Sequence, residues 1–359
     1  MLKVKRTFHP VGQGAFYTET FLDYRYPIGM VVYDCGVSGG NAPLINCLNE
    51  QFNMYGSNID LLFVSHFHAD HISHVPYLLR NCHVKAIVLP VITPTVSVDA
   101  YLNNYIEAGT LKSDTLTFLE NIYGEQPGLD GTKIVFVNSL SVGNNKSHED
   151  GEFLVLDDIQ ANVGTINSER VLRLYGWEYI LCNYPCAHSS ALVDEMRKQY
   201  PELLDAMLKR KWEDVRSLLG KIPFKDIAQL YKDCFKKNEN EESMTVLSKP
   251  ISNDYPPTSS CLYTGDSPFR NSSRLKYVKN YYSNYWKMIG TLQAPHHGAD
   301  EDNPEELYDF HRTCVTCYGT GNSYGHPGRQ ALINMATSRS NIRLVTELPN
   351  SLFQQYISY

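Results

Sequence analysis

The stretch Ser65-His66-Phe67-His68-Ala69-Asp70-His71 decides how this chain is interpreted. It directly follows Ile59 to Val64, a continuous apolar run of strand length, and it precedes Ile72 to Arg80, which has helical spacing. A strand that ends in His-x-His-x-Asp-His places several donor groups on one loop and on the first turn of a helix. Coincidence explains this poorly, because the chain has only 12 histidines in 359 residues.

The spacing of these donors predicts a site for divalent ions. Side chains two residues apart at a strand end face the same side, so His66 and His68 can bind one ion together. Asp70 and His71 begin the next helix and suit a second ion. Mixed imidazole and carboxylate ligands fit zinc, manganese or iron, and the lack of a nearby thiolate argues against a structural zinc site. We expect His74 to lie behind the ligands or on the surface.

Two later segments also end in donor groups. Leu262-Tyr263-Thr264-Gly265-Asp266 is a short strand followed by a carboxylate that can bridge two ions. Thr291 to Gly298 is a strand followed by His296 and His297. Since sites in α/β proteins form at strand ends, these groups are expected to face the first motif. Asp34, which follows the apolar run Met30 to Tyr33, is placed to support the metal loop.

The pattern of expected strands and helices in the rest of the chain predicts a layered α/β architecture. Short apolar strands alternate with glycine-rich turns and helical segments over the first 95 residues, and strand texture returns after residue 245. Residues 190–245 are charged and carry helical spacing, which predicts two or three amphipathic helices. They form either an insertion packed on the core, or a lid or dimerisation arm.

Composition favours a soluble cytoplasmic protein. The apolar and charged fractions, 43% and 20%, are ordinary for a globular domain, and the net charge of −7 argues against nonspecific coating of nucleic acid. The first residues lack a secretory signal, and no run approaches the roughly 18 apolar residues of a membrane span. The nine cysteines are expected to be reduced. Buried thiols are the preferred interpretation of the Cys314/Cys317 and Cys182/Cys186 pairs.

In their order and local sequence, these motifs resemble those of the metallo-β-lactamase superfamily. The resemblance is greatest to the hydrolase domain of the ComEC competence proteins and its stand-alone relatives. The resemblance is carried by Val11-Gly12-Gln13-Gly14, Val32-Tyr33-Asp34-Cys35-Gly36, Ser65 to His71, Tyr263-Thr264-Gly265-Asp266, Pro295-His296-His297-Gly298 and Asn322-Ser323-Tyr324-Gly325-His326-Pro327. It covers most of the chain except the helical segment. The transmembrane channel of the competence proteins has no counterpart, so DNA transport is not implied.

The resemblance implies an αββα four-layer sandwich, with residues 1–359 as one domain and 190–245 as a helical insertion. It implies two ions, zinc or manganese. His66 and His68 would hold one ion, Asp70, His71 and His296 the other, and Asp266 would bridge them. Many members have one further histidine ligand, for which His188 is the first candidate and His148 the second.

A dimetal site of this kind predicts hydrolysis by activated water, with Asp70 in the catalytic set. A general acid is then needed at the leaving oxygen. His297 and His326 are the candidates, since both lie on loops that we expect at the entrance of the metal site. A structural turn is the alternative role for His326.

A basic and aromatic stretch follows Asp266. It combines five cations with four tyrosines and a tryptophan between Arg270 and Lys287, as single-stranded nucleic acid requires. We assign substrate contacts to Arg270, Arg274, Lys276 and Tyr277. The alternative is an ordinary amphipathic helix whose aromatic residues face the core.

These observations favour a phosphodiesterase or nuclease that acts on nucleic acid or nucleotides. Two alternatives are a hydrolase of a small carboxylic ester, lactone or thioester, and a non-catalytic regulatory module. No membrane partner is expected, and the insertion could support a homodimer.

Overall fold

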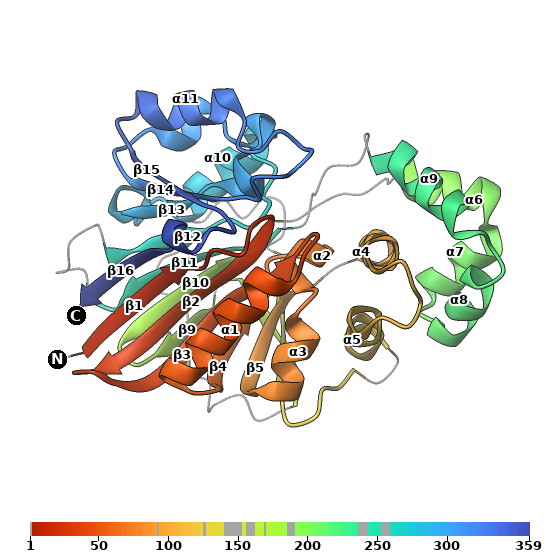
Figure 1. Ribbon diagram of the computed structural model, residues 1–359, viewed down its shortest axis with the longest axis horizontal. Helices are drawn as coiled ribbons and strands as arrows, with labels where there is room; N and C mark the ends of the chain where they lie inside the picture. Colours follow the sequence, from red (N-terminus) through yellow and green to blue (C-terminus); the bar gives the residue numbers. More distant parts are fainter. Residues whose placement is uncertain are drawn as a thin grey trace.

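Two mixed β-sheets form the centre of the structure, which is a computed structural model (Figure 1). It describes residues 2–91, 93–124, 127–139, 153–155, 162–168, 170–184, 191–235, 243–252 and 259–359. The first sheet runs in the order β16 (Phe353–Ser358), β1 (Leu2–Phe8), β2 (Gly14–Asp23), β3 (Tyr26–Val37), β4 (Asn58–Phe63), β5 (His83–Pro90), β6 (Lys133–Asn138) and β8 (Val163–Asn167). The second runs in the order β15 (Asn341–Val345), β14 (Thr313–Cys317), β13 (Thr291–Gln293), β12 (Cys261–Tyr263), β11 (Thr245–Pro250), β10 (Trp177–Cys182), β9 (Val171–Leu174) and β7 (Phe153–Val155).

Each sheet has an antiparallel part and a parallel part. In the first sheet the strands from β16 to β3 pair antiparallel, and those from β3 to β8 pair parallel. In the second, β12 to β15 pair parallel, and β9 to β12 pair antiparallel. Parallel strands need crossover connections, and helices supply many of them here. The metal loop follows β4, and the Asp266 and His296 loops follow β12 and β13, so all three leave carboxyl ends of parallel strands.

Helices cover the outer faces of both sheets (Figure 1). Those on the first sheet are α1 (Ala42–Tyr55), α2 (Ala69–Ile72), α3 (Val75–Asn81), α4 (Pro94–Ala108) and α5 (Asp114–Tyr123). The second sheet carries α10 (Ser272–Tyr281), α11 (Arg329–Thr337) and the short 3-10 helices η3 (Trp286–Met288), η4 (Pro295–Gly298), η5 (Asp300–Asp302), η6 (Glu305–Tyr308) and η7 (Pro349–Ser351).

Three apolar clusters fill the spaces between these four layers. Strand β4 shows the alternation: Leu61 and Phe63 point into the cluster between the sheets, while Leu62 and Val64 point toward the helices. A third cluster lies between the second sheet and its helices. This layering confirms the predicted αββα sandwich.

The cysteine pair in β14 follows the same alternation. Cys314 belongs to the cluster beneath the helices and Cys317 to the cluster between the sheets, so their side chains point to opposite faces. Both are free and buried, as predicted, and so is Cys182. Cys186 lies outside the described residues.

Four helices, rather than the two or three predicted, make up the described part of the insertion. They are α6 (Ala191–Gln199), α7 (Pro201–Leu208), α8 (Trp212–Leu219) and α9 (Phe224–Phe235). Prolines explain the extra breaks, because Pro201 begins α7 and Pro223 separates α8 from α9.

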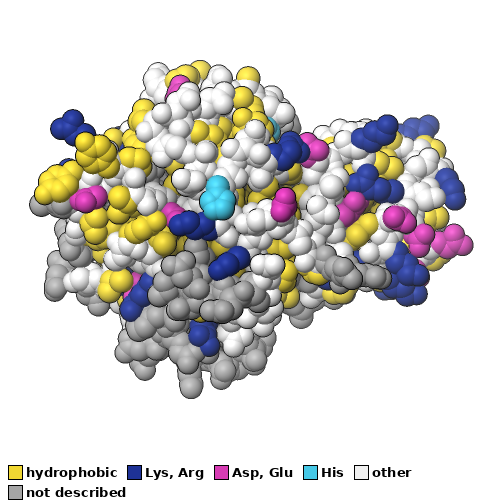
Figure 2. Space-filling model, turned by 90° about the horizontal axis from the view of Figure 1, so that it is seen from below, with side chains coloured by type: hydrophobic (Ala, Val, Ile, Leu, Met, Phe, Trp, Pro, Cys, Tyr) yellow, Lys and Arg dark blue, Asp and Glu magenta, His cyan; other side chains and the backbone are white. Residues whose placement is uncertain are grey.

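The insertion packs on the core beside α4, as Figure 1 shows, and its buried side chains share one cluster with those of α1 to α5. Charged side chains gather on the projecting lobe that it forms at the right of Figure 2. A homodimer through this lobe, and the assignment of the whole chain to one domain, stay predictions. Among the described helices none has the length and apolar character to cross a bilayer.

Candidate metal centre

The first wall of the site is the loop between β4 and α2. His68 precedes the first turn of α2, and its carbonyl oxygen accepts hydrogen bonds from the backbone N–H groups of His71 and Ile72. Asp70 and His71 therefore lie on the first helical turn, as predicted. The side chains of His66 and His71 are almost completely buried, whereas that of Asp70 is 18% exposed. His74 is buried as well, so its predicted surface alternative is wrong.

The second wall comes from the loop after β12. Asp266 is 2% exposed, and its backbone N–H donates to Ser243 Oγ at 3.0 Å. Gly265 has a φ of +54°, and a Cβ there would lie 2.2 Å from Ser243 Oγ and 2.6 Å from Ser65 Cβ. Only glycine therefore allows the Asp266 loop to approach the metal loop this closely.

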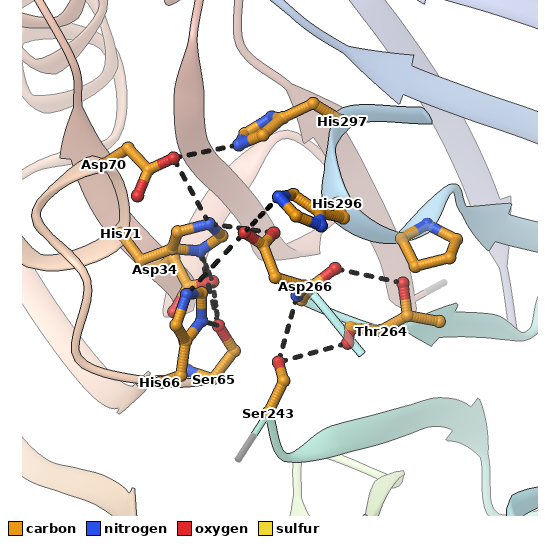
Figure 3. A network of polar contacts seen from close by, with 12 residues as sticks. Asp34, Ser65, His66, Asp70, His71, Ser243, Thr264, Asp266, His296 and His297 are labelled. Carbon is orange, nitrogen blue, oxygen red and sulfur yellow. Dashed lines mark hydrogen bonds and ion pairs between the residues drawn. The ribbon is translucent and has the colours of Figure 1, made fainter. Parts of the chain in front are cut away.

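Four side chains, from these two walls and from η4 after β13, converge on one point (Figure 3). One ligand atom from each of Asp70, His71, Asp266 and His297 lies within 4.8 Å of the others. His71 Nε2 is 3.1 Å from Asp266 Oδ1, and His297 Nε2 is 3.0 Å from Asp70 Oδ2. Two imidazoles and two carboxylates are a donor set that divalent zinc or manganese accepts.

Hydrogen bonds behind the rings orient these imidazoles. Asp34 Oδ2 accepts from His71 Nδ1 at 2.8 Å, and the carbonyl oxygen of Cys317 accepts from His297 Nδ1 at 2.9 Å. Each Nδ1 therefore carries a proton, and each Nε2 is the nitrogen that faces the cluster. This is how oxygen acceptors behind a ring set metal-binding histidines, and it gives Asp34 the supporting role predicted for it.

Protonated His71 balances the carboxylates of the metal-free protein. Burial alone would lower the pKa of His71, but Asp266, Asp70 and Asp34 raise it well above its ordinary value. Burial would likewise raise the pKa of Asp266, but cationic His71 and the nearby His296 hold it well below its usual range. A metal ion would supply the same positive charge.

The buried ring of His66 shows whether these residues suit a metal ion. Its Nδ1 meets Ser65 Oγ at 3.0 Å, while its buried Nε2 makes no hydrogen bond within the described residues and lies 3.7 Å from Asp266 Oδ2. Burial, with the cation of His71 beside it, holds the pKa of His66 well below its ordinary value, so the ring is neutral. A buried neutral nitrogen that faces a carboxylate fits a metal ligand, so these residues suit the ions that the motif predicts.

The two adjacent histidines of η4 lie at different distances from the cluster, in the opposite order to the one predicted. His297, predicted as a general acid, belongs to the cluster and is 4% exposed. His296, predicted as a ligand, lies outside that cluster, and its Nε2 is 3.9 Å from Asp266 Oδ2. Both have left-handed backbones, with φ of 48° and 52°, and this turn aims the second ring inward.

His296 has the features of a proton donor. Its Nδ1 donates to Asp302 Oδ2 at 2.7 Å, and its side chain is 24% exposed. Burial lowers the pKa of His296, but Asp266 and Asp302 outweigh it and raise the pKa. The ring centroids of His326 and His296 are 5.3 Å apart, so His326 also lies beside the metal site. Burial and the neighbouring histidines lower the pKa of His326 to about 4, which weighs against its predicted role as general acid.

Of the remaining predicted ligands, the structure describes His68 but neither His188 nor His148. His68 Nε2 pairs with Asp99 Oδ2 at 2.9 Å, and the ring centroids of His66 and His68 are 5.0 Å apart. His188 and His148 lie outside the described residues, so the further histidine ligand stays a prediction.

Three of the five aromatic residues of the basic stretch pack in the core. Tyr281 donates to the Leu181 carbonyl oxygen at 2.8 Å, and Tyr282 and Trp286 belong to the same buried cluster. These rings cannot stack on bases, so the amphipathic-helix alternative describes them correctly.

The four residues to which we assigned substrate contacts differ in accessibility. Arg274 is 3% exposed and lies 4.6 Å from the centroid of the Tyr184 ring, which weighs against its predicted substrate contact. Lys276 is exposed and Tyr277 half-buried, and their roles stay predictions. Arg270 lies closest to the site, because its Nε is 3.3 Å from Asp302 Oδ1.

Asp99 and Asp302, the carboxylates that accept hydrogen bonds from His68 and His296, were not predicted from the sequence. Asp302 follows His296 by six residues in an acidic turn, and Asp99 lies in an ordinary helix far along the chain from His68. Neither has a distinguishing local pattern, since only the fold brings each carboxylate to its ring.

The four-layer αββα sandwich and the histidines and aspartates at its strand ends define the class of this protein as an α/β protein with a candidate metal centre. Comparison with known proteins agrees: the model of the metallo-beta-lactamase superfamily matches residues 29–145. The superfamily predicted from the motifs is thereby confirmed over the matched residues. The ComEC-type branch stays a prediction.

Individual relatives are distant. Cleavage and polyadenylation specificity factor subunit 3 of Dictyostelium discoideum is 27% identical over 106 residues, which are 29% of this chain and only 14% of that protein's length. The metallo-beta-lactamase fold protein YhfI from Bacillus subtilis superposes with a TM-score of 0.41 at 10% identity over 99% of both chains. A mutant metallo-beta-lactamase from Cronobacter sakazakii gives a TM-score of 0.28 at 9% identity over 79% of this chain and 74% of its own.

Proposed function

We propose that this protein is a metal-dependent phosphodiesterase or nuclease that acts on nucleic acid or nucleotides and uses two divalent ions, zinc or manganese. The observation that carries the proposal is the convergence of Asp70, His71, Asp266 and His297 beside the neutral, buried Nε2 of His66. The substrate class is supported by the partial match to a relative named for cleavage and polyadenylation, which are operations on a polynucleotide.

Asp70, His71 and His297 would hold one ion, His66 and His68 the other, and Asp266 would contact both. Ions so bound supply Lewis acidity and lower the pKa of water toward neutrality. Arg270, which ends beside Asp302, is placed to contact a phosphate oxygen near His296.

In the hydrolysis, the oxygen of water bonds to phosphorus and the bond from phosphorus to the leaving oxygen breaks. The leaving oxygen then needs a proton, and His296 Nε2 is placed to donate it. Asp302 holds the opposite nitrogen of this ring and stabilises its cation, as a carboxylate behind a catalytic histidine does.

Activity assays on the zinc- or manganese-loaded protein test this proposal. We expect cleavage of bis-p-nitrophenyl phosphate and of single-stranded DNA, and none by the His68→Ala, Asp70→Ala double variant. His311→Ala is the matched control, because His311 is exposed and its Nδ1 bonds to the Arg339 carbonyl oxygen before the amino ends of β14 and β15, whereas the site lies at carboxyl ends of strands. A double variant as active as the wild type would show that the site is misassigned.

One observation favours a second candidate, a hydrolase of a small carboxylic ester, lactone or thioester. Burial and the neighbouring Asp70 raise the pKa of Glu107, so a further acidic group lies close to the metal loop. Such a group would repel a polyanion more than a small neutral substrate. Turnover of lactones or thioesters without any phosphodiester cleavage would establish this candidate instead.

A further inference from the structure

Helix α4 holds the metal loop by its backbone. Asn104 Nδ2 donates to the carbonyl oxygen of Phe67 at 2.7 Å, and the backbone N–H of Ala69 donates to Asn103 Oδ1 at 3.0 Å. The residues on both sides of His68 are thus fixed to one helix, which lies outside the motif that supplies the donors.

The same helix holds the ring of His68 itself. Asp99 Oδ2 is 2.9 Å from His68 Nε2, and a carboxylate can only accept this hydrogen bond. Nε2 therefore carries the proton, and Nδ1 is the nitrogen left to bind a metal. In the neighbouring ring of His66 the arrangement is opposite, since its Nδ1 meets Ser65 Oγ and its Nε2 faces Asp266.

Tyr231 lies in α9, the last helix of the insertion, which packs against α4. Its side chain is buried, and Asp99 and Asn103 are polar side chains that act on its hydroxyl. Burial raises the pKa of Tyr231 well above its ordinary value, and Asp99 adds to the increase. The hydroxyl therefore stays protonated.

The insertion is firmly attached to the helices that carry these groups. The rings of Trp212 in α8 and Tyr101 in α4 stack with centroids 5.0 Å apart and an interplanar angle of 8°. Arg216 in α8 makes two hydrogen bonds to the Glu120 carboxylate in α5, at 2.7 and 2.8 Å. A shift of the insertion would therefore be transmitted to α4.

We propose that Asp99 of α4 positions His68 so that Nδ1 of His68 faces the ion, and that the insertion α6–α9 supports this arrangement by packing on α4, with Tyr231 as its residue next to Asp99. Asp99 and Tyr231 are positioning residues in this arrangement. The inference rests on the proposed metal centre, but it requires no assumption about the substrate.

Zinc binding measured without substrate tests the inference. We expect Asp99→Ala to weaken binding of one of the two ions by about 10–100-fold and to leave the other unchanged, as loss of a carboxylate behind a metal-binding histidine does. Asp99→Asn keeps an oxygen acceptor and should restore part of the affinity, and Tyr231→Phe should cause a smaller loss at the same ion. Competition with a chromophoric chelator gives both affinities.

Two control variants separate positioning from packing. Tyr105→Phe alters a different buried tyrosine, which lies in α4. Asp205→Ala removes an exposed carboxylate of α7. Both should bind zinc as the wild type does. Nitrogen NMR of the zinc-loaded protein should show His68 protonated at Nε2 in the wild type and in Asp99→Asn, and a mixed or altered state in Asp99→Ala.

Unchanged zinc affinities in Asp99→Ala would overturn the inference. So would an equal weakening of both ions accompanied by a matching loss of thermal stability in the metal-free protein, because that is the behaviour of a packing defect. A wild-type protein that binds no zinc or manganese would instead remove the metal centre itself, and it would do so before any variant is compared.

Discussion

At the scale of single residues, the site depends on which nitrogen of each histidine is held from behind. An oxygen acceptor fixes one nitrogen as a donor, so the opposite nitrogen faces the cluster. Asp34 does this for His71 and the Cys317 carbonyl oxygen for His297. Asp302 does the same for His296, but that ring lies outside the cluster and is more exposed.

The proton-donor role of His296 predicts a dependence on the leaving group. His296→Gln should lose about 10²–10⁴-fold of kcat/KM on a dinucleotide, whose alkoxide leaving group needs a proton. It should lose far less on bis-p-nitrophenyl phosphate, whose leaving group is stable as an anion. Rates on both substrates, with metal content measured in parallel, check this expectation.

The outcome depends on the comparison between the two substrates. Equal losses on both, or a loss of bound metal in His296→Gln, would show that His296 is a ligand or a structural residue rather than the acid.

At the scale of elements, close approach of two loops sets the geometry of the centre. Gly265 follows β12 in a left-handed conformation, and a Cβ would meet Ser243 and Ser65. The space there is set by the metal loop after β4, so the two sheets are coupled at this position.

Gly265→Ala should therefore reduce the free energy of unfolding by about 2–4 kcal/mol, from backbone strain together with overpacking. Gly109→Ala is the matched control, since Gly109 ends α4 at a φ of +64° with open space around its Cβ position. It should lose only about 1 kcal/mol, from strain alone. Urea denaturation of both variants gives the comparison, and equal losses would contradict the proposed steric contact.

The elements also show how far the sequence could predict the structure. The apolar runs and the donors at their ends predicted a layered α/β fold and the two walls of the site, because these are properties of local spacing. The four-layer sandwich was predicted from the family resemblance. Which of His296 and His297 faces the cluster was not predictable, since it depends on two consecutive left-handed residues. Asp99 and Asp302 could not be found either, because tertiary packing alone brings them to their rings.

At the scale of the whole molecule, a buried polar network joins the two sheets. Arg6 Nε donates to Glu19 Oε1 at 2.7 Å, and both side chains are nearly inaccessible. Glu19 also accepts from Tyr179 at 2.8 Å and from Tyr263 at 3.1 Å, and these tyrosines belong to the second sheet. The carboxylate thus compensates a buried guanidinium and pairs hydroxyl groups of the opposite layer.

Glu19→Leu should cost about 3–5 kcal/mol of unfolding free energy, because Arg6 would remain buried without a counter-ion. The Arg6→Met, Glu19→Leu double variant should lose less, since both charges are then absent. Asp205→Ala, at an exposed pair with Lys209, should change stability by less than about 1 kcal/mol. Chemical denaturation measures all three, and a double variant less stable than Glu19→Leu would refute this account of the network.

We expect Asp70, His71, Asp266 and His297 to hold a metal ion, and anomalous X-ray diffraction at the zinc edge from crystals of the zinc-loaded protein is the most direct test. An anomalous peak should lie about 2.0–2.2 Å from the Nε2 atoms of His71 and His297, with His296 outside the coordination sphere. A peak coordinated by His296 in place of His297, or no peak among these four side chains, would contradict this expectation.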